Sequence, residues 1–183
     1  LAEALGVGAA GIQVGTLFAF CDESGFTPEI KASVLSDAAR GAVDVFTDPL
    51  ASPTGFPFKT VRRADDPVKG VERQRICDLG YLRIPFRTPK GDLGYRCAAE
   101  PVDAYLKKGG SLADTEGRNC LCNALMAGIG HGQVRGDGLM EQPVITTGDD
   151  YRSEAGGTGT GKYDESTGAY YCRWLKDITT TGT

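Results

Sequence analysis

The first apolar positions of the chain repeat at helical spacing and then merge into a continuous apolar run. Leu1 and Leu5 lie four residues apart, which places them on one face of a helix that we expect Gly6 to end. The run from Ala10 to Val14 is too short and too uniformly apolar to alternate, which is typical of a parallel strand covered on both faces. A Gly15-Thr16 turn and a new apolar segment follow. The pattern predicts a helix, a buried strand and a turn, in that order.

The next apolar face belongs to a helix with clear start signals. Thr27-Pro28-Glu29 provides a cap, a proline at the first helical position and an acid in the first turn. The helix is expected to continue to Arg40-Gly41, and its apolar positions are Ile30, Val34, Leu35 and Ala38. A short strand is predicted from Val43 to Thr47, and three prolines predict an extended course from Asp48 to Lys59.

Beyond residue 60 the hydrophobic pattern loses its regularity. Residues 62–75 are charged and predicted to be exposed, and residues 77–122 are expected to be irregular because glycines recur along them. A helix is predicted over residues 119–129, and its packed face is expected to comprise Leu121, Leu125 and either Ala124 or Gly128. The chain thus divides into residues 1–60, a loop-rich Cys-containing extension over 61–150, and a flexible linker and tail over 151–183.

The Gly15-Thr16 turn is the strongest candidate for ligand chemistry. Gly15 has no Cβ, so the backbone there can approach an anion closely, and the first amides of the following segment point at such a ligand. Thr16 adds a hydroxyl donor. The helix and strand before this turn match the last units of a (β/α)8 barrel, whose loops after strands 7 and 8 often bind phosphate.

The same stretch and several later blocks resemble a known enzyme family. The blocks that carry the resemblance are Leu1-Ala2-Glu3-Ala4-Leu5, Gly8-Ala9-Ala10-Gly11-Ile12-Gln13-Val14-Gly15-Thr16, Phe18, Glu23-Ser24, Pro28-Glu29-Ile30-Lys31, Asp48 to Lys59, Cys77-Asp78-Leu79-Gly80-Tyr81-Leu82, Gly94-Tyr95-Arg96-Cys97, Cys120-Leu121-Cys122-Asn123 and Gly148-Asp149-Asp150. They are similar to nitronate monooxygenases, once called 2-nitropropane dioxygenases, and to one bacterial branch of that family in particular. The resemblance covers about residues 1–150.

This resemblance implies an FMN-dependent enzyme that oxidises alkyl nitronates with O2. It implies an α/β fold in which the chain is the C-terminal portion of a (β/α)8 TIM barrel, followed by an irregular Cys- and Gly-rich extension. In the family, the segment at the end of strand 8 contacts the FMN phosphate and ribityl chain, and it corresponds here to Gln13, Val14, Gly15 and Thr16. The family's catalytic histidine would lie upstream of Leu1, so no catalytic residue is assigned. We expect the chain to be a fragment of its parent enzyme that binds FMN weakly or not at all by itself.

Composition narrows the class of partner. The chain has 183 residues, of which 40% are hydrophobic and 24% charged, and this balance is ordinary for a globular protein with one sizeable core. A net charge of −4 without a basic stripe argues against nucleic-acid binding, so the expected partner is a small-molecule substrate. The apolar start lacks a basic region typical of a signal peptide, and no segment is long enough to span a bilayer. A cytoplasmic location without membrane contact is expected, and the oligomeric state stays open.

The cysteines offer a second function from another class. Without a secretion signal, reduced thiols are the expected state of all six. Four of them could converge on zinc, form a redox pair or remain buried thiols, and these are Cys77, Cys97, Cys120 and Cys122. Their spacing is unlike that of structural zinc sites, so no metal ligand is assigned. The alternative function is a non-catalytic zinc- or thiol-stabilised interaction module.

Three further motifs carry little functional weight. His131 is the single histidine, and its Gly-His-Gly setting favours a surface loop over a catalytic base. Residues 156–162 match G-x-x-x-x-G-K, but Tyr163 replaces the magnesium-binding Ser or Thr, which favours a linker. Asp149-Asp150 is expected to form a turn. Another FMN oxidoreductase, such as an enoyl-thioester reductase, would share the Gly15-Thr16 turn and remains an alternative.

Overall fold

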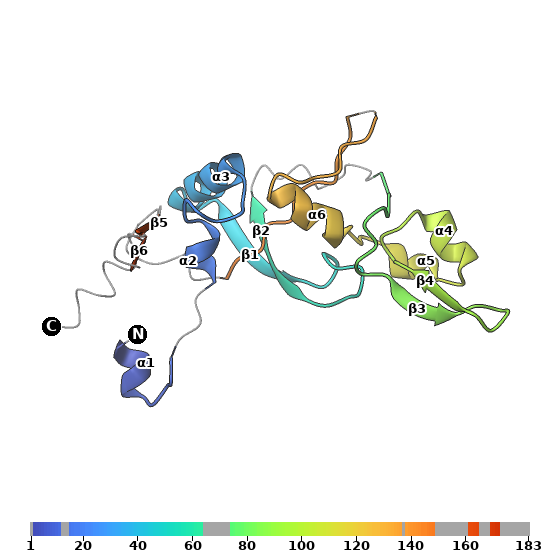
Figure 1. Ribbon diagram of the computed structural model, residues 1–183, viewed down its shortest axis with the longest axis horizontal. Coiled ribbons are helices and arrows are strands. Elements are labelled where there is room, and N and C mark those ends of the chain that lie inside the picture. The colour runs from blue at the N-terminus through green and yellow to red at the C-terminus, as the bar shows by residue number, and fades with distance from the viewer. Residues whose placement is uncertain are drawn as a thin grey trace. The chain divides into compact units, whose positions relative to one another are not determined.

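The protein is described from a computed structural model (Figure 1). The structure describes residues 2–11, 15–63, 74–136, 138–148, 161–164 and 169–172. The chain forms two compact units, which are treated separately. Unit 1 comprises residues 1–44 and 147–183, and unit 2 comprises residues 45–146.

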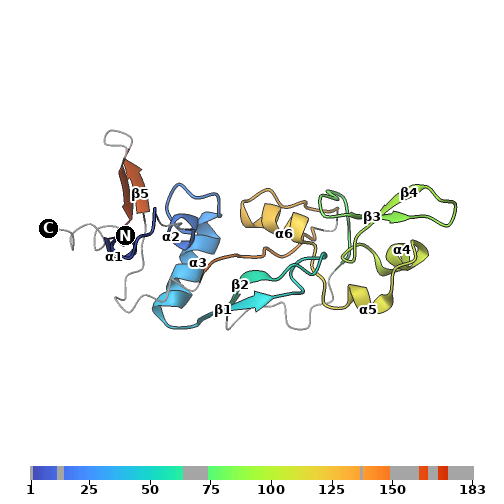
Figure 2. The ribbon, with the colours of Figure 1, turned by 90° about the horizontal axis from the view of Figure 1, so that it is seen from below.

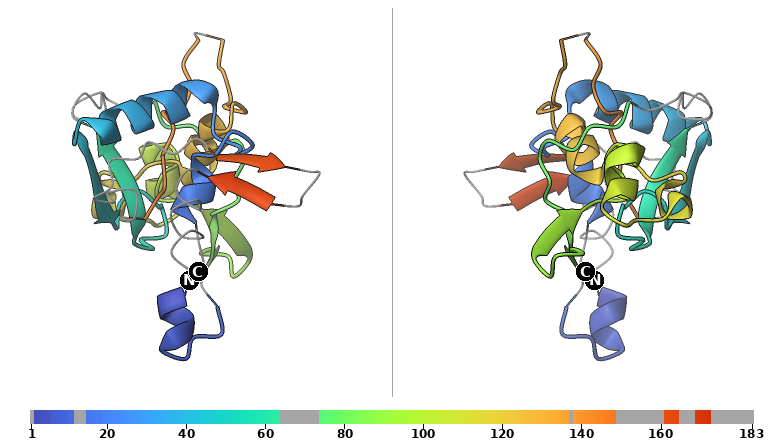
Figure 3. Two further views of the ribbon diagram at one scale, coloured as in Figure 1. Left: turned by 90° about the vertical axis from the view of Figure 1, so that its left-hand side faces the viewer. Right: turned by 90° about the vertical axis from the view of Figure 1, so that its right-hand side faces the viewer.

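Unit 1 contains three helices and one hairpin among its described residues. The helices are α1 (Ala2–Gly6), α2 (Thr16–Ala19) and α3 (Pro28–Ala39). The strands β5 (Gly161–Asp164) and β6 (Ala169–Cys172) pair antiparallel, with Gly161 opposite Cys172 (Figure 3). This hairpin occupies part of the segment that was expected to be a flexible linker and tail.

The sequence signals at the start of α3 are confirmed. Thr27 has extended backbone angles and its hydroxyl accepts a hydrogen bond from the Ile30 amide at 3.4 Å, while Pro28 occupies the first helical position. Lys31 holds the loop between α2 and α3 in place, because its ammonium donates to the carbonyl oxygens of Cys21 and Asp22 at 3.1 and 2.8 Å. Val34 is buried on the packed side of the helix.

Unit 2 contains short strands and helices joined by turns. The sheet of β1 (Val43–Asp48) and β2 (Phe58–Arg63) is two-stranded, and the amide of Val61 donates to Ile145 at 2.9 Å. β1 begins at the end of unit 1, and its burial alternates because strand side chains point to opposite faces: Val43 and Val45 are buried, and Asp44 is exposed. β1 confirms the strand that the sequence predicts at this place.

A hairpin of β3 (Ile84–Arg87) and β4 (Leu93–Arg96) follows. The strands pair antiparallel with Ile84 opposite Arg96 and Arg87 opposite Leu93. One face is half-buried where the Arg96 guanidinium lies 5.0 Å from the centre of the Phe86 ring. The opposite face leaves Leu93 exposed beside Tyr95.

Three helices lie in the described part of unit 2, and they are α4 (Val102–Lys107), α5 (Leu112–Thr115) and α6 (Leu121–Gly128). α4 and α5 contact each other (Figure 2), and the Tyr105 hydroxyl donates to the Asp114 carboxylate at 3.2 Å. Gly110 permits this packing, since a Cβ there would lie 2.1 Å from the Tyr105 ring. Nearby, the buried Glu100 carboxylate pairs with the Lys108 ammonium at 2.8 Å.

Several predictions from the sequence were wrong. Ala10 and Gly11, the expected start of a buried strand, are exposed and belong to no strand, and residues 12–14 lie outside the described residues. The segment from residue 77 to 122 holds β3, β4, α4 and α5, which were missed because each is only four to six residues long and carries a weak signal in the sequence. The predicted helix over residues 119–129 exists as α6, but Leu125 is exposed where a packed position was expected.

Two further expectations hold only in part. The segment after β1 bends instead of running extended, and the amide of Gly55 closes a turn onto the carbonyl oxygen of Ser52 at 3.1 Å. Arg75 was expected to be exposed, yet it is half-buried, because its guanidinium donates to the carbonyl oxygens of Ala98 and Thr115 at 3.1 and 2.6 Å. Residues 64–73 lie outside the described residues.

Candidate functional site

The predicted phosphate turn lies in unit 1, at the start of α2. Gly15 is the residue before the helix, and a Cβ at this position would meet no other atom within 4 Å. Thr16 is buried, and its hydroxyl oxygen accepts a hydrogen bond from the amide of Gly148 at 2.8 Å. Gln13 and Val14 lie outside the described residues, as does Asp149-Asp150. Two of the four expected flavin-binding residues are therefore described, and one of them is held by a segment far along the chain.

Unit 2 holds a cluster of four cysteines, which we call the thiol cluster. Its buried part is Cys97, Ala99 and Cys120, and Cys77 and Cys122 pack against these residues from partly buried positions. The four cysteines that the sequence analysis singled out are thus brought together. They come from the loop before β3, the end of β4 and the beginning of α6. All four are free thiols.

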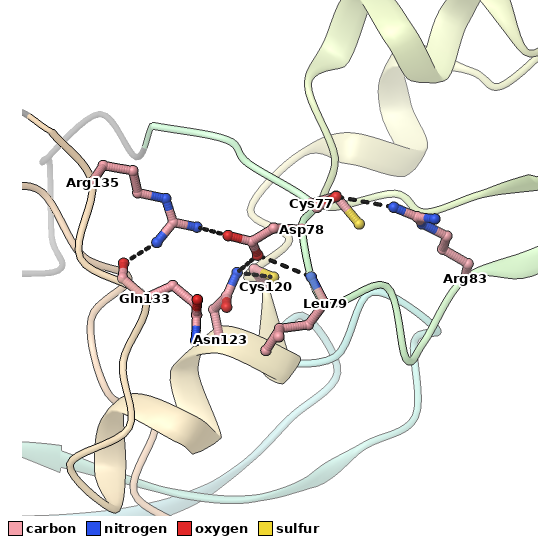
Figure 4. A network of polar contacts seen from close by, with 8 residues as sticks. All are labelled: Cys77, Asp78, Leu79, Arg83, Cys120, Asn123, Gln133 and Arg135. Carbon is pink, nitrogen blue, oxygen red and sulfur yellow. Dashed lines mark hydrogen bonds and ion pairs between the residues drawn. The ribbon is translucent and has the colours of Figure 1, made fainter.

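A tight turn positions a guanidinium beside Cys77. Gly80 adopts a φ of +69°, and the amide of Arg83 closes the turn onto its carbonyl oxygen at 3.4 Å. Arg83 then folds back and donates to the carbonyl oxygen of Cys77 at 3.0 Å (Figure 4). A Cβ at Gly80 would lie 2.8 Å from the Arg83 guanidinium carbon, so a glycine is needed for this approach.

Hydrogen bonding separates the acidities of two thiols in the cluster. A hydrogen bond from the Cys97 thiol, with a further one from Arg83, lowers the pKa of Cys77 from 9.0 to about 6, although burial opposes the change. Donating that same hydrogen bond, together with burial, raises the pKa of Cys97. Near neutral pH the arrangement therefore favours a thiolate on Cys77 and a protonated thiol on Cys97.

A polar network supports the cluster from the side of α6 (Figure 4). Asn123 is fully buried, and its side-chain amide donates to the Asp78 carboxylate at 2.8 Å and to the Cys120 sulfur at 3.5 Å. Arg135 donates to the other oxygen of Asp78 at 2.7 Å. Burial raises the pKa of the Asp78 carboxyl, but the bonds from Asn123 and its own loop and the charge of Arg135 outweigh this and lower it. The loop that carries Cys77 is consequently fixed to α6 by a buried neutral donor, Asn123, and to the segment after α6 by a charged one, Arg135.

The described residues contain no group of three or more His, Cys, Asp or Glu side chains arranged to hold a metal ion. His131 lies in an exposed loop directly after α6, and its amide donates to the carbonyl oxygen of Met126 at 2.8 Å, as its Gly-His-Gly setting predicts. Of the G-x-x-x-x-G-K match, residues 156–160 lie outside the described residues, and Gly161 and Lys162 begin β5.

Sequence reasoning identified the four sulfurs but missed the residues that set their environment. Arg83, Gly80 and Asn123 carry no motif by themselves. A usable signal was the polar residue inside the otherwise apolar α6, since a buried amide requires partners. A second usable signal was Asp78, directly after Cys77, because its carboxylate is a suitable acceptor for that buried amide.

Comparisons of the chain with protein-family models, curated proteins and solved structures gave no match. In the part of the chain that the structure describes, no helix has the length and apolarity needed to cross a bilayer.

Proposed function

We propose that this chain is the C-terminal part of an FMN-dependent oxidoreductase that resembles nitronate monooxygenase and oxidises alkyl nitronates with O2. In this proposal Gln13, Val14, Gly15 and Thr16 contact the phosphate end of FMN. The observation that carries it is the Gly15-Thr16 turn, which has the family's sequence and begins a helix in unit 1. The proposal rests on the resemblance for the identity of the cofactor.

The two described residues of this turn fit an anion. The space around the Gly15 Cα lets a phosphate oxygen come close to the backbone, because no side chain lies within 4 Å of a Cβ placed there. The hydroxyl of Thr16 is positioned by the amide of Gly148. When bound, FMN would supply the electron transfer, and the residues of this turn would hold its phosphate. Substrate positioning and proton abstraction are assigned to no residue of this chain.

A comparison of FMN with riboflavin tests the phosphate contact. Equilibrium dialysis of the 183-residue chain is expected to show weak binding of FMN and still weaker binding of riboflavin, because riboflavin lacks the phosphate. The substitution Thr16→Val keeps the shape of the side chain and removes the hydroxyl, so it should reduce the difference between the two ligands. Equal binding of both ligands, or tight FMN binding that Thr16→Val leaves unchanged, would contradict the assigned role.

One observation favours a second candidate, the thiol-stabilised interaction module. The thiol cluster lies at the junction of the loop before β3, the end of β4 and the start of α6, and the β3–β4 hairpin exposes Leu93 and Tyr95. A thiol count before and after chelation, with metal analysis of the purified chain, distinguishes a zinc-stabilised module from one that is held together by packed thiols. Bound zinc with four of the six thiols masked supports a metal-stabilised module, and six free thiols without zinc leave only the thiol-packed form.

Another FMN oxidoreductase, such as an enoyl-thioester reductase, shares the Gly15-Thr16 turn. It differs from the first proposal in its substrate and in the reaction that the flavin would support. Turnover of an alkyl nitronate against an enoyl thioester by the parent enzyme distinguishes the two.

A further inference from the structure

The cysteines of the thiol cluster differ in their access to solvent and in the charge beside them. Cys97 and Cys120 are each 4% exposed, whereas Cys77 is only partly buried. Cys77 also has a cation beside it, since the Arg83 guanidinium donates to its carbonyl oxygen at 3.0 Å. A partly exposed sulfur next to a fixed guanidinium is the environment of a reactive thiolate.

A second sulfur already faces the first. Cys77 packs against the buried group that contains Cys97, and the two side chains share a hydrogen bond that shifts the pKa of each. Cys97 is buried and is therefore shielded from reagents in solution. One thiol is thus placed to meet an oxidant, and the other is placed to meet the oxidised first thiol.

We propose that Cys77 and Cys97 are a redox pair, in which a hydroperoxide oxidises Cys77 and Cys97 then closes an intramolecular disulfide. The Cys77 thiolate attacks one oxygen of H2O2, so an S–O bond forms, the O–O bond breaks, and the departing hydroxide takes up a proton to become water. The Cys97 sulfur then attacks the resulting sulfenic sulfur. The S–S bond forms, the S–O bond breaks, and the departing hydroxide takes the Cys97 proton. Two thiols are oxidised by two electrons in total, and one peroxide is reduced to two waters.

The remaining cysteines of the cluster are less suited to this reaction. Cys120 is the residue directly before α6, and Cys122 lies in the first turn of that helix. The Cys120 sulfur is buried and accepts the Asn123 amide at 3.5 Å. The proposal uses no residue of the Gly15-Thr16 turn, so it is independent of the flavin proposal.

Peptide mapping of the whole chain tests the pairing directly. The chain is reduced, freed of metal with a chelator, treated with one equivalent of hydrogen peroxide, blocked with an alkylating reagent and digested with trypsin without reduction. Cleavage after Lys and Arg places Cys77 on peptide 76–83, Cys97 on 97–107, and Cys120 and Cys122 together on 119–135. The expected product is peptide 76–83 joined to 97–107 and two hydrogens lighter than the sum of the two. A main product that involves peptide 119–135, or that joins two chains, would overturn the proposal.

Cysteine variants separate the role of Cys77, which reacts with peroxide, from that of Cys97, which closes the disulfide. In Cys97→Ser the disulfide cannot form, so the sulfenic acid on Cys77 is expected to accumulate and to give at least about fivefold more dimedone adduct on peptide 76–83. In Cys77→Ser neither the adduct nor the disulfide should form. Cys21→Ser is the matched control, because Cys21 lies in unit 1, where its thiol donates a hydrogen bond to the Phe18 carbonyl oxygen at 3.0 Å. It should leave the cross-link unchanged.

The wild-type map does not depend on the folding of any variant, so the proposal stays testable if Cys97→Ser fails to fold. Metal analysis of the chain before chelation adds one more outcome. A stoichiometric metal ion that protects all four thiols from peroxide in the untreated chain would overturn the redox assignment in favour of a metal site.

Discussion

The two compact units carry candidate chemistry of different kinds. In unit 1 the candidate is a turn of adjacent residues, where Gly15 and Thr16 offer backbone and one hydroxyl. In unit 2 the candidate is assembled from side chains of distant segments, with sulfurs, a carboxylate, an amide and guanidinium groups meeting around Cys77. A backbone site for an anion needs only a short contiguous motif, so the sequence can point to it. A side-chain site built across turns leaves scattered residues in the sequence and becomes visible only in the fold.

The largest expected effect comes from a substitution in the polar network beside the thiol cluster. The substitution Asn123→Asp places a second carboxylate at a fully buried position, against the Asp78 oxygen that now accepts the Asn123 amide at 2.8 Å. Two facing carboxylates without a donor between them should lower the free energy of unfolding of unit 2 by about 3 kcal/mol at pH 7. Urea unfolding measures the loss. Leu125→Gln, at an exposed position of the same helix, is the control and should change stability by less than about 0.5 kcal/mol. Equal effects of the two would contradict the network.

The second prediction concerns the buried ion pair of unit 2. Lys108→Met leaves the Glu100 carboxylate, which is 3% exposed, without the ammonium that now donates to both of its oxygens at 2.8 and 2.9 Å. The expected loss is about 2 kcal/mol, because Lys108 is itself partly exposed and water can replace part of the interaction. Lys107→Met removes an exposed ammonium from the adjacent position and should be nearly neutral. Thermal unfolding of the two variants side by side measures the difference, and similar melting temperatures would argue against the pair.

The third prediction is a pH profile that sharpens the contrast within the thiol cluster. Because the pKa of Cys77 is lowered from 9.0 to about 6, its alkylation rate should rise with pH around a midpoint near 6. Cys97→Ala removes the thiol donor and moves the midpoint upward. A full return of the pKa to 9.0 would lower the thiolate fraction at pH 6 by about 500-fold, and the greater nucleophilicity of the more basic sulfur would offset this in part, so the reaction is expected to be slower by up to about 20-fold. Iodoacetamide labelling of peptide 76–83 measures the rate.

The conservative variant is the control for this profile. Cys97→Ser retains a hydrogen-bond donor, so the midpoint should stay close to that of the wild type. A midpoint near 9 in the wild-type chain would contradict the arrangement. The lowered pKa also makes the free energy of unfolding depend on pH. Because the folded state favours the thiolate of Cys77, its contribution to stability is fully present above pH 9 and is lost as the pH falls toward 6.

The sequence predicted those elements whose signals are local. α1, α3 and β1 lie where glycine, the Thr27-Pro28 start and the apolar run place them. The β3–β4 hairpin was missed because its strands are four residues each and their stability depends on pairing. On α6 the expected apolar position Leu125 is exposed, and the buried polar residue Asn123 takes the packed side, where its amide donates to Asp78, a partner 45 residues away in the sequence.

The same reasoning applies to the candidate sites. The Gly15-Thr16 turn was identified from adjacent residues, whereas the convergence of the four cysteines was one of several open alternatives, and the sequence did not predict which of them would pair. Arg83 could not be placed beside Cys77 from the sequence, because that contact requires the positive φ of Gly80.

The fourth prediction tests the turn at Gly80. Gly80→Ala adds a Cβ at a φ of +69° and 2.8 Å from the Arg83 guanidinium carbon, so the chain must shift or the arginine must leave. The expected loss of stability is about 1 kcal/mol, and the alkylation midpoint of Cys77 should rise because the cation moves away. Gly136→Ala is the control, since a Cβ there meets nothing within 4 Å. An unchanged midpoint in Gly80→Ala would show that Arg83 does not act on the sulfur.

The smallest expected effect lies in unit 1 and tests whether the two units are separate. Thr27→Ala removes the hydroxyl that accepts the Ile30 amide at 3.4 Å, and this long bond is worth only about 0.5 kcal/mol. Hydrogen exchange should become faster at the first amides of α3, and Thr27→Ser should restore the protection. The alkylation midpoint of Cys77 should stay near pH 6 in both variants, because the residues that set it belong to unit 2. If weakening the start of α3 moved that midpoint, the thiol cluster would depend on unit 1, and the contrast between a local turn and a self-contained side-chain site would fail.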